Sequence, residues 1–176
     1  MDLVWSIVIN TVIALAIFYL LIVIVDIGFM MSFRSIMKHH DHDLSIILTN
    51  KRDNTSKLVP ILSANGVKMD KRIVEALNNF DLTRIAHQDG EDAKNAREEL
   101  TLMTEYFLGL CRDNDKIYQD EEYLLIENNL NEIDRVYREH VTMYNADVLG
   151  YNFWVNFVLT RYIYLIFRVK KKDIIN

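Results

Sequence analysis

Hydrophobic residues follow two different patterns along this chain. From Leu3 to Val25 almost every position is apolar, and the only polar side chains are Ser6, Asn10 and Thr11. Beyond this run, apolar residues recur every three or four positions, which is the spacing of one face of an α-helix. No stretch of useful length alternates between apolar and polar residues as a half-buried strand does. The pattern therefore predicts an all-α protein with an apolar N-terminal helix.

The apolar run is long enough to cross a membrane. A helix needs about 20 apolar residues to span the hydrocarbon core, and a small soluble protein rarely contains a helix that is apolar on every side. No lysine or arginine precedes the run, and no small-residue cleavage site follows it, so a signal peptide is not indicated. We predict an uncleaved transmembrane anchor over residues 1–33. Asp26, at its end, is expected to reach the water of the lipid headgroups.

Charges on either side of the run indicate its orientation. Asp2 is the only charged residue before it, whereas Arg34 and Lys38 follow it and Lys51 and Arg52 come soon afterwards. Basic residues remain preferentially on the cytoplasmic side of a membrane. The N-terminus is therefore expected outside the cell. The rest of the chain, with the C-terminus, is expected in the cytoplasm.

The helical pattern after the anchor predicts a cytoplasmic bundle over residues 34–152. About four helices are expected, over residues 35–64, 70–88, 91–111 and from about 120 past 151. Only Gly28 interrupts the chain between the anchor and the first of these helices, so the two can be continuous. Pro60 is expected to kink that helix or end it early. Short breaks such as Asn65-Gly66 and Asp89-Gly90 favour a long antiparallel, up-and-down order.

The most specific motif lies in the last long helix. The segment from Tyr144 to Asn152 reads YNADVLGYN, so that two Tyr-Asn pairs, the second beginning at Tyr151, flank Val148. The tyrosines are seven residues apart and share one helix face, and Asn145 and Asn152 share the adjacent one. This signature resembles the LemA family, whose membrane-anchored bacterial helical proteins carry a similar pair of YN motifs in their last long helix.

Other positions resemble the same family. The lead-in over 115–122 and the basic pair with Asp at Lys51-Arg52-Asp53 have its spacing, and the resemblance is strongest over 116–152 and weak over 67–95. Asn54-Thr55-Ser56 replaces the Leu-Ile-Pro of the family, and the usual proline after the second YN pair is missing. These departures are typical of a divergent member.

The resemblance implies a single-pass protein of the bacterial cytoplasmic (inner) membrane with a cytoplasmic bundle and no established enzymatic activity. The residues themselves suggest that the YN pairs fix packing and helix register, and contact with a ligand or partner is the alternative. We therefore expect a non-enzymatic, membrane-tethered scaffold or interaction protein. It would act in contact with the lipid bilayer, through a protein partner or by self-association. A signal-transducing membrane component is an alternative function.

Composition changes this picture mainly by exclusion. The chain of 176 residues has one cysteine, Cys111, which rules out an intrachain disulfide framework or a zinc site with several cysteine ligands. Its net charge of −5 disfavours a nucleic-acid partner. No nucleotide-binding, metalloprotease or hydrolase motif is present. We therefore predict no catalytic residue and no cofactor, and we expect Cys111 to be a small packed residue.

One run, KHHDHD from Lys38 to Asp43, contains side chains that commonly bind metals. On a helix only pairs such as His39 and Asp43 converge, which provides two ligands where a site needs three or four. We therefore predict no metal site and interpret the run as a solvated stretch that can respond to pH. His140 lies in the last long helix, at one of the positions where apolar residues otherwise recur every three or four residues. It is expected to be a hydrogen-bonded core residue rather than a ligand.

The last segment, residues 153–176, combines aromatic, apolar and basic side chains. An amphipathic helix that lies on an anionic membrane surface has this composition, which makes membrane binding or remodelling through this segment an alternative function. Packing into the bundle stays open, as does a second membrane span, although Asn156, Thr160 and Arg161 disfavour the latter. The candidate contacts with lipid headgroups are the basic residues Arg161, Arg168, Lys170, Lys171 and Lys172.

Overall fold

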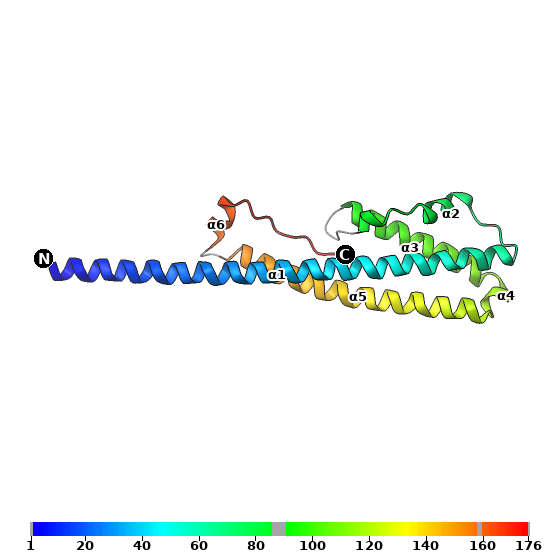
Figure 1. Ribbon diagram of the computed structural model, residues 1–176, viewed down its shortest axis with the longest axis horizontal. Helices are drawn as coiled ribbons and strands as arrows, with labels where there is room; N and C mark the ends of the chain where they lie inside the picture. The colour runs from blue at the N-terminus through cyan, green and yellow to red at the C-terminus, as the bar shows by residue number, and fades with distance from the viewer. Residues whose placement is uncertain (1, 86–90, 158–159, 176) are drawn as a thin grey trace. The chain divides into compact units, whose positions relative to one another are not determined.

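The chain is all-α, as predicted. A computed structural model describes residues 2–85, 91–157 and 160–175, and all regular structure in these ranges is helical. The elements are α1 (Asp2–Ala64), α2 (Lys71–Asn78), the 3-10 helix η1 (Leu82–Ile85), α3 (Glu91–Arg112), α4 (Asp115–Tyr118), α5 (Glu121–Val155) and α6 (Arg161–Ile166) (Figure 1).

The apolar run and the first bundle helix form one uninterrupted helix, α1, of 63 residues. Gly28 does not break it, because a single glycine inside a helix costs only about 0.5–1 kcal/mol relative to alanine. Pro60 also lies inside the helix and does not end it, because α1 continues to Ala64. The proline is close enough to the C-terminal end that only one further turn depends on the helix continuing past it.

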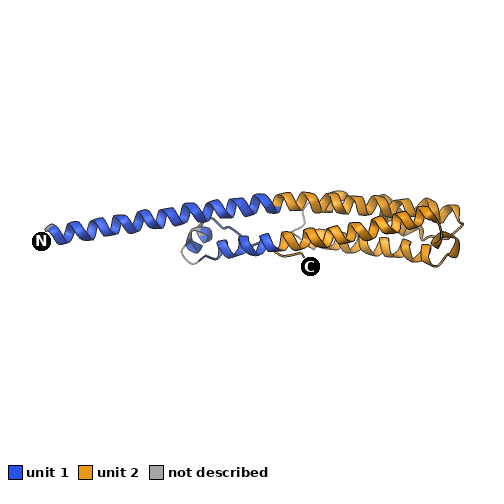
Figure 2. Cartoon of the chain, turned by 90° about the horizontal axis from the view of Figure 1, so that it is seen from below, with its two compact units in different colours: residues 1–37, 146–172 blue, residues 38–145, 173–176 orange. Residues whose placement is uncertain are grey.

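Contacts divide the chain into two units, coloured separately in Figure 2. Unit 1 contains residues 1–37 and 146–172, and unit 2 contains residues 38–145 and 173–176. Both α1 and α5 contribute residues to each unit.

Unit 2 contains the hydrophobic core of the bundle. The part of α1 in this unit and α3 run in one direction, and α2 and the part of α5 in this unit run in the other (Figure 1), which is the predicted antiparallel order. Buried side chains from the three long helices meet in this core, namely Leu48, Leu58 and Leu62 of α1, Leu100, Met103 and Phe107 of α3, and Tyr123, Ile126 and Leu130 of α5. In α3 and α5 these residues are three and four positions apart, which is the spacing that the sequence predicts for the buried face of both helices.

Two polar contacts cross the core of unit 2. The ammonium group of Lys51 on α1 lies 2.7 Å from a carboxylate oxygen of Asp134 on α5. Lys51 is buried, whereas the Asp134 side chain is 40% exposed. The hydroxyl groups of Thr55 and Thr104 lie 2.9 Å apart and join α1 to α3. These pairs satisfy polar groups that would otherwise be costly to bury.

The second bundle helix is shorter than the predicted range of 70–88. The helix α2 ends at Asn78, and a separate 3-10 turn, η1, begins at Leu82. Between them, the Asp81 carboxylate accepts hydrogen bonds from the backbone N–H and the hydroxyl of Thr83. This local turn competes with continuation of the helix. Residues 86–90 of the expected helix lie outside the described residues.

In unit 1, the side chains from Leu3 to Leu21 are all exposed. Within the described residues, α1 is the only helix long and apolar enough to cross a membrane. The aromatic rings of Phe29 and Trp154 stack in parallel with centroids 4.8 Å apart and join α1 to α5. Exposure of so long an apolar run is unfavourable in water. An N-terminal helix that can span a membrane is thus present, as predicted.

The expected amphipathic helix over the last segment does not form as one element. The helix α5 ends at Val155, α6 has six residues, and residues 169–175 have no regular structure. At the end of α6, Arg168 adopts a positive φ of 50°, and the N–H of Val169 donates to the carbonyl of Tyr164. This hydrogen-bond pattern ends a helix and turns the chain away from its axis.

Candidate functional site

The YN signature lies on α5 and contributes both to the packing and to the C-terminal segment. Tyr144 in unit 2 and Val148 and Tyr151 in unit 1 are buried. Their burial is what the packing interpretation of the motif expects. The two asparagines are only partly buried, and both make hydrogen bonds that the sequence did not predict.

Each asparagine holds the backbone of one residue near the C-terminus. In unit 2, the Asn145 amide donates to the carbonyl of Ile175 and accepts from its N–H, both at 2.8 Å. In unit 1, Asn152 does the same with Lys172, at 2.8 and 2.9 Å. Such a side chain offers the donor and acceptor that a neighbouring β-strand would offer. We call these two contacts the asparagine clamps.

The spacing of the two asparagines suits an extended segment. Seven helical residues advance about 10.5 Å at about 1.5 Å per residue. Three extended residues advance about 10 Å at about 3.3 Å per residue. An i, i+7 pair of asparagines on a helix therefore matches an i, i+3 pair of backbone positions in an extended chain. Because each asparagine binds backbone groups, no residue type in the C-terminal segment could have indicated this contact.

The candidate headgroup contacts are mostly solvent-exposed. Arg161, Arg168, Lys170 and Lys171 are exposed, and Lys172 is half-buried beside its clamp. On and just after α6, three large apolar side chains are exposed together with the arginines, namely Tyr162 at 73%, Leu165 at 62% and Phe167 at 74%. Unit 1 therefore presents aromatic and basic groups next to one another, although from a short helix and its C-terminal end.

Asp26 corrects an expectation. It is 0% exposed and so does not reach water in unit 1, because the segment around α6 folds back onto α1. The Thr160 hydroxyl donates a hydrogen bond to the Asp26 carboxylate, and Tyr164 is buried close by. The other carboxylate oxygen, Oδ1, has no hydrogen-bond partner among the residues that the structure describes. The apolar run thus ends at a covered carboxylate.

A cluster of three potential metal ligands lies in unit 2. His40 and Asp43 lie one turn apart on α1, and His140 comes from α5. One ligand atom from each of the three lies within 4.8 Å of the other two. The rings of His40 and His140 have centroids 6.2 Å apart and planes at 75°. All three residues are partly buried, which leaves room for a solvent ligand. We call these residues the His-Asp cluster.

This cluster extends the pair that the sequence predicts. His39 and Asp43 do converge, with Nε2 and Oδ2 3.7 Å apart, but the His39 side chain is 74% exposed. No spacing in the sequence associates His140, on α5, with these residues of α1. Its Nδ1 atom is buried and has no hydrogen-bond partner in the described part of the chain. The interpretation of His140 as a hydrogen-bonded core residue therefore does not hold at this nitrogen.

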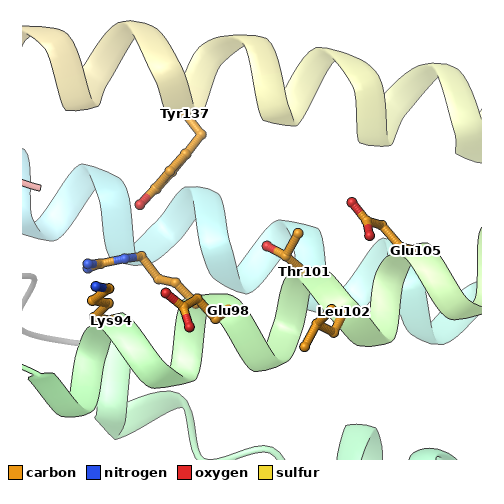
Figure 3. A pocket seen from close by; sticks show the side chains of 7 residues that line it. Lys94, Glu98, Thr101, Leu102, Glu105 and Tyr137 are labelled. Atoms are coloured by element: carbon orange, nitrogen blue, oxygen red, sulfur yellow. The ribbon is translucent and has the colours of Figure 1, made fainter. Parts of the chain in front are cut away.

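A pocket of about 470 Å³ lies between α3 and α5 in unit 2 (Figure 3). Tyr137 extends from α5 toward α3, where charged side chains of both signs line the pocket. Burial raises the pKa of Tyr137, and the charge of Arg97 opposes that rise. The pocket is lined by Lys94, Arg97, Glu98, Thr101, Leu102, Glu105 and Tyr137. This lining offers charged and hydroxyl groups that could recognise a polar ligand.

Cys111 is buried at the end of α3. Burial, with the charge of Glu127 as a smaller contribution, raises the pKa of its thiol to about 11. The thiol is therefore protonated near neutral pH, and a protonated thiol is a poor nucleophile and a poor metal ligand. Its position agrees with the expectation of a small packed residue.

Comparisons with known proteins add no relative to this picture. The resemblance to the LemA family therefore stays a prediction from the sequence motif. No known protein family, curated protein or solved structure matches this chain.

Proposed function

We propose that this chain is a membrane-tethered, non-enzymatic scaffold or interaction protein of LemA-like type. Its single anchor crosses the bacterial cytoplasmic (inner) membrane with the N-terminus outside, and the bundle and C-terminus lie in the cytoplasm. The observation that carries the proposal is the continuity of α1. One helix supplies both the exposed apolar run of unit 1 and the buried residues Leu48, Leu58 and Leu62 of the core of unit 2.

This continuity supports a tether because no loop separates anchor and bundle along the chain. A helix interior has all its backbone hydrogen bonds satisfied, so α1 can pass from lipid to water without exposing unpaired backbone groups. The basic residues Arg34 and Lys38 follow the apolar run and are exposed, as the proposed orientation requires.

The orientation is tested by labelling single cysteines in a Cys111→Ser background. One variant carries a cysteine added before Met1, and the other carries Glu121→Cys, at an exposed position on α5. A membrane-impermeant maleimide should label the first in intact cells and the second only after the membrane is opened. The reverse pattern would contradict the N-out orientation, and equal labelling of both in intact cells would contradict the membrane anchor.

The scaffold role is tested by photo-crosslinking in cells. Leu102 on α3 and Leu125 on α5 are 67% and 62% exposed, and large apolar groups at the surface are the positions most suited to contact a partner. A photoreactive residue at either position should yield a discrete adduct with a partner or with a second copy. The matched control is exposed Glu132 on the same α5. No adduct from either leucine, or equal adducts from Glu132, would contradict an interaction surface there.

Membrane-surface binding through α6 is a second candidate function. The observation that favours it is the exposed set Tyr162, Leu165 and Phe167 beside Arg161 and Arg168. In unit 1 this set belongs to the segment that covers Asp26, and Asp26 directly follows the apolar run. The end of a membrane-spanning run lies at the lipid–water interface, which aromatic and basic side chains favour.

A fluorophore at Leu165→Cys in the Cys111→Ser protein tests this second candidate in nanodiscs. Lipid-borne quenchers should quench it strongly in anionic lipid and less in zwitterionic lipid. The double substitution Arg161→Glu and Arg168→Glu should abolish that difference. A fluorophore at Glu132→Cys is the control that should not be quenched. Equal quenching at both positions would remove the support for α6.

A further inference from the structure

The His-Asp cluster has the composition of a metal site rather than of an ordinary polar contact. Two imidazole rings and one carboxylate are ligands that divalent transition cations share, whereas Mg²⁺ and Ca²⁺ prefer oxygen ligands alone. The ligand atoms come from two helices, with His40 and Asp43 on α1 and His140 on α5. Within unit 2 these three side chains converge, and no cysteine belongs to the cluster.

Distances in the cluster are close to those of an occupied site. In a tetrahedral zinc site with bonds of about 2.0–2.1 Å, neighbouring ligand atoms lie about 3.3 Å apart. The three atoms of the His-Asp cluster lie within 4.8 Å of one another. Rotation of partly exposed side chains can close the difference, because a change of about 1.5 Å is less than the reach of one χ rotation.

The histidine from α5 has a nitrogen that lacks a partner. Nδ1 of His140 is buried and makes no hydrogen bond within the described residues. Leaving such a buried polar atom without a partner is unfavourable. The His140 ring can turn to present one nitrogen to a metal ion and the other to solvent. Both nitrogens then have a partner.

From these observations we propose that His40, Asp43 and His140 bind one divalent transition metal ion of the zinc class. Water completes the coordination, because all three side chains are partly exposed. The ion joins α1 to α5 between residues that are far apart in the sequence. The unfolded chain does not hold these ligands together, so the ion stabilises the folded bundle. This inference does not depend on the proposed scaffold function.

The test uses the full-length chain in detergent, purified with a tag that contains no histidine and stripped of metal. Zn²⁺ is titrated by calorimetry, and thermal unfolding is followed with and without Zn²⁺, with Mg²⁺ as the comparison ion. The variants are His40→Ala and His140→Ala. The matched control is His39→Ala, because His39 lies outside the cluster and is largely exposed, and its Nε2 atom lies 3.7 Å from the Asp43 carboxylate, too far for a hydrogen bond that would hold this ligand in place.

The expected result is one Zn²⁺ per chain, a rise in Tm with Zn²⁺ and no rise with Mg²⁺. Loss of a partner that merely supports a ligand costs about 10–100-fold in metal affinity. His40→Ala and His140→Ala, which remove ligands, should therefore weaken Zn²⁺ binding at least tenfold and remove the Tm shift. His39→Ala should keep both.

Three outcomes would overturn the proposal. These are the absence of saturable Zn²⁺ binding, unchanged binding in both cluster variants, and loss of binding in His39→Ala alone. Far-UV circular dichroism without metal checks that each variant folds. If His140→Ala does not fold, His40→Ala and Asp43→Asn on α1 provide the same comparison, and retention of full affinity in both would overturn the site.

Discussion

The side-chain amide of Asn152 forms two hydrogen bonds to the backbone of Lys172, at 2.8 Å to the carbonyl oxygen and 2.9 Å from the N–H. This pairing assigns a role to the asparagine of the second YN motif. The tyrosine of the motif, Tyr151, is buried, and its hydroxyl group lies 3.2 Å from the carbonyl oxygen of Lys170. In unit 1 the motif thus both buries its tyrosine and holds the C-terminal segment.

The clamps predict how the C-terminal segment is protected. Asn152→Ala removes two hydrogen bonds, each worth about 0.5–1.5 kcal/mol, so the segment around Lys172 should detach more often. Trypsin should then cleave at Lys170 to Lys172 several-fold faster than in the unaltered chain. Asn131→Ala, an exposed position on the same helix, is the control. Equal cleavage rates in all three proteins would show that the clamp does not protect the segment.

The Lys51–Asp134 pair predicts an asymmetry between its two partners. Asp134→Ala leaves the buried Lys51 ammonium without its carboxylate, which should lower the free energy of unfolding by about 1.5–3 kcal/mol. Lys51→Met removes the buried charge itself and fills similar space, so its cost should be below about 1.5 kcal/mol. Chemical unfolding of both variants measures the difference. A larger cost for Lys51→Met would contradict the assignment of Lys51 as the buried partner.

Three glycine-to-alanine substitutions should differ in sign. Gly109 lies inside α3 with open space around it, so alanine should stabilise the fold by about 0.5–1 kcal/mol through helix propensity. Gly66 ends α1 with a positive φ of 69°, where alanine should cost about 1 kcal/mol.

At Gly150, the third position, a methyl group would meet the Phe33 ring at 2.7 Å, so the gain in propensity should be lost. The free energies of unfolding should therefore rank with the Gly109 variant highest and the Gly66 variant lowest. Identical effects at Gly109 and Gly150 would contradict the close approach of α1 and α5 in unit 1.

The pKa of Cys111 predicts its reactivity. With the pKa raised to about 11, the thiolate fraction near neutral pH is far below that of an ordinary exposed thiol. Maleimide should therefore modify the native protein very slowly and the denatured protein fast, and the native rate should rise with pH up to that pKa. Glu121→Cys in the Cys111→Ser background provides the exposed reference. Rapid labelling of native Cys111 would show that the thiol is accessible.

The sequence by itself determined the elements whose signals are local. The apolar run and the three–four spacing of α3 and α5 depend on backbone hydrogen bonds and burial periodicity within one helix, so α3 was predicted at 91–111 and is found at Glu91–Arg112. The range that the sequence predicts for the second helix is too long, because the helical pattern continues past Asp81, where a local turn ends the helix instead.

Only the tertiary structure decided which side chains meet. His140 joins His40 and Asp43 because α5 lies against α1 in a particular register in unit 2, and register is invisible in the periodicity of either helix. The asparagine clamps and the covered carboxylate of Asp26 depend on backbone and hydroxyl groups of a segment that folds back. A periodic pattern specifies which face is buried. Which side chains pack on that face depends on where the tertiary fold places the other segments of the chain.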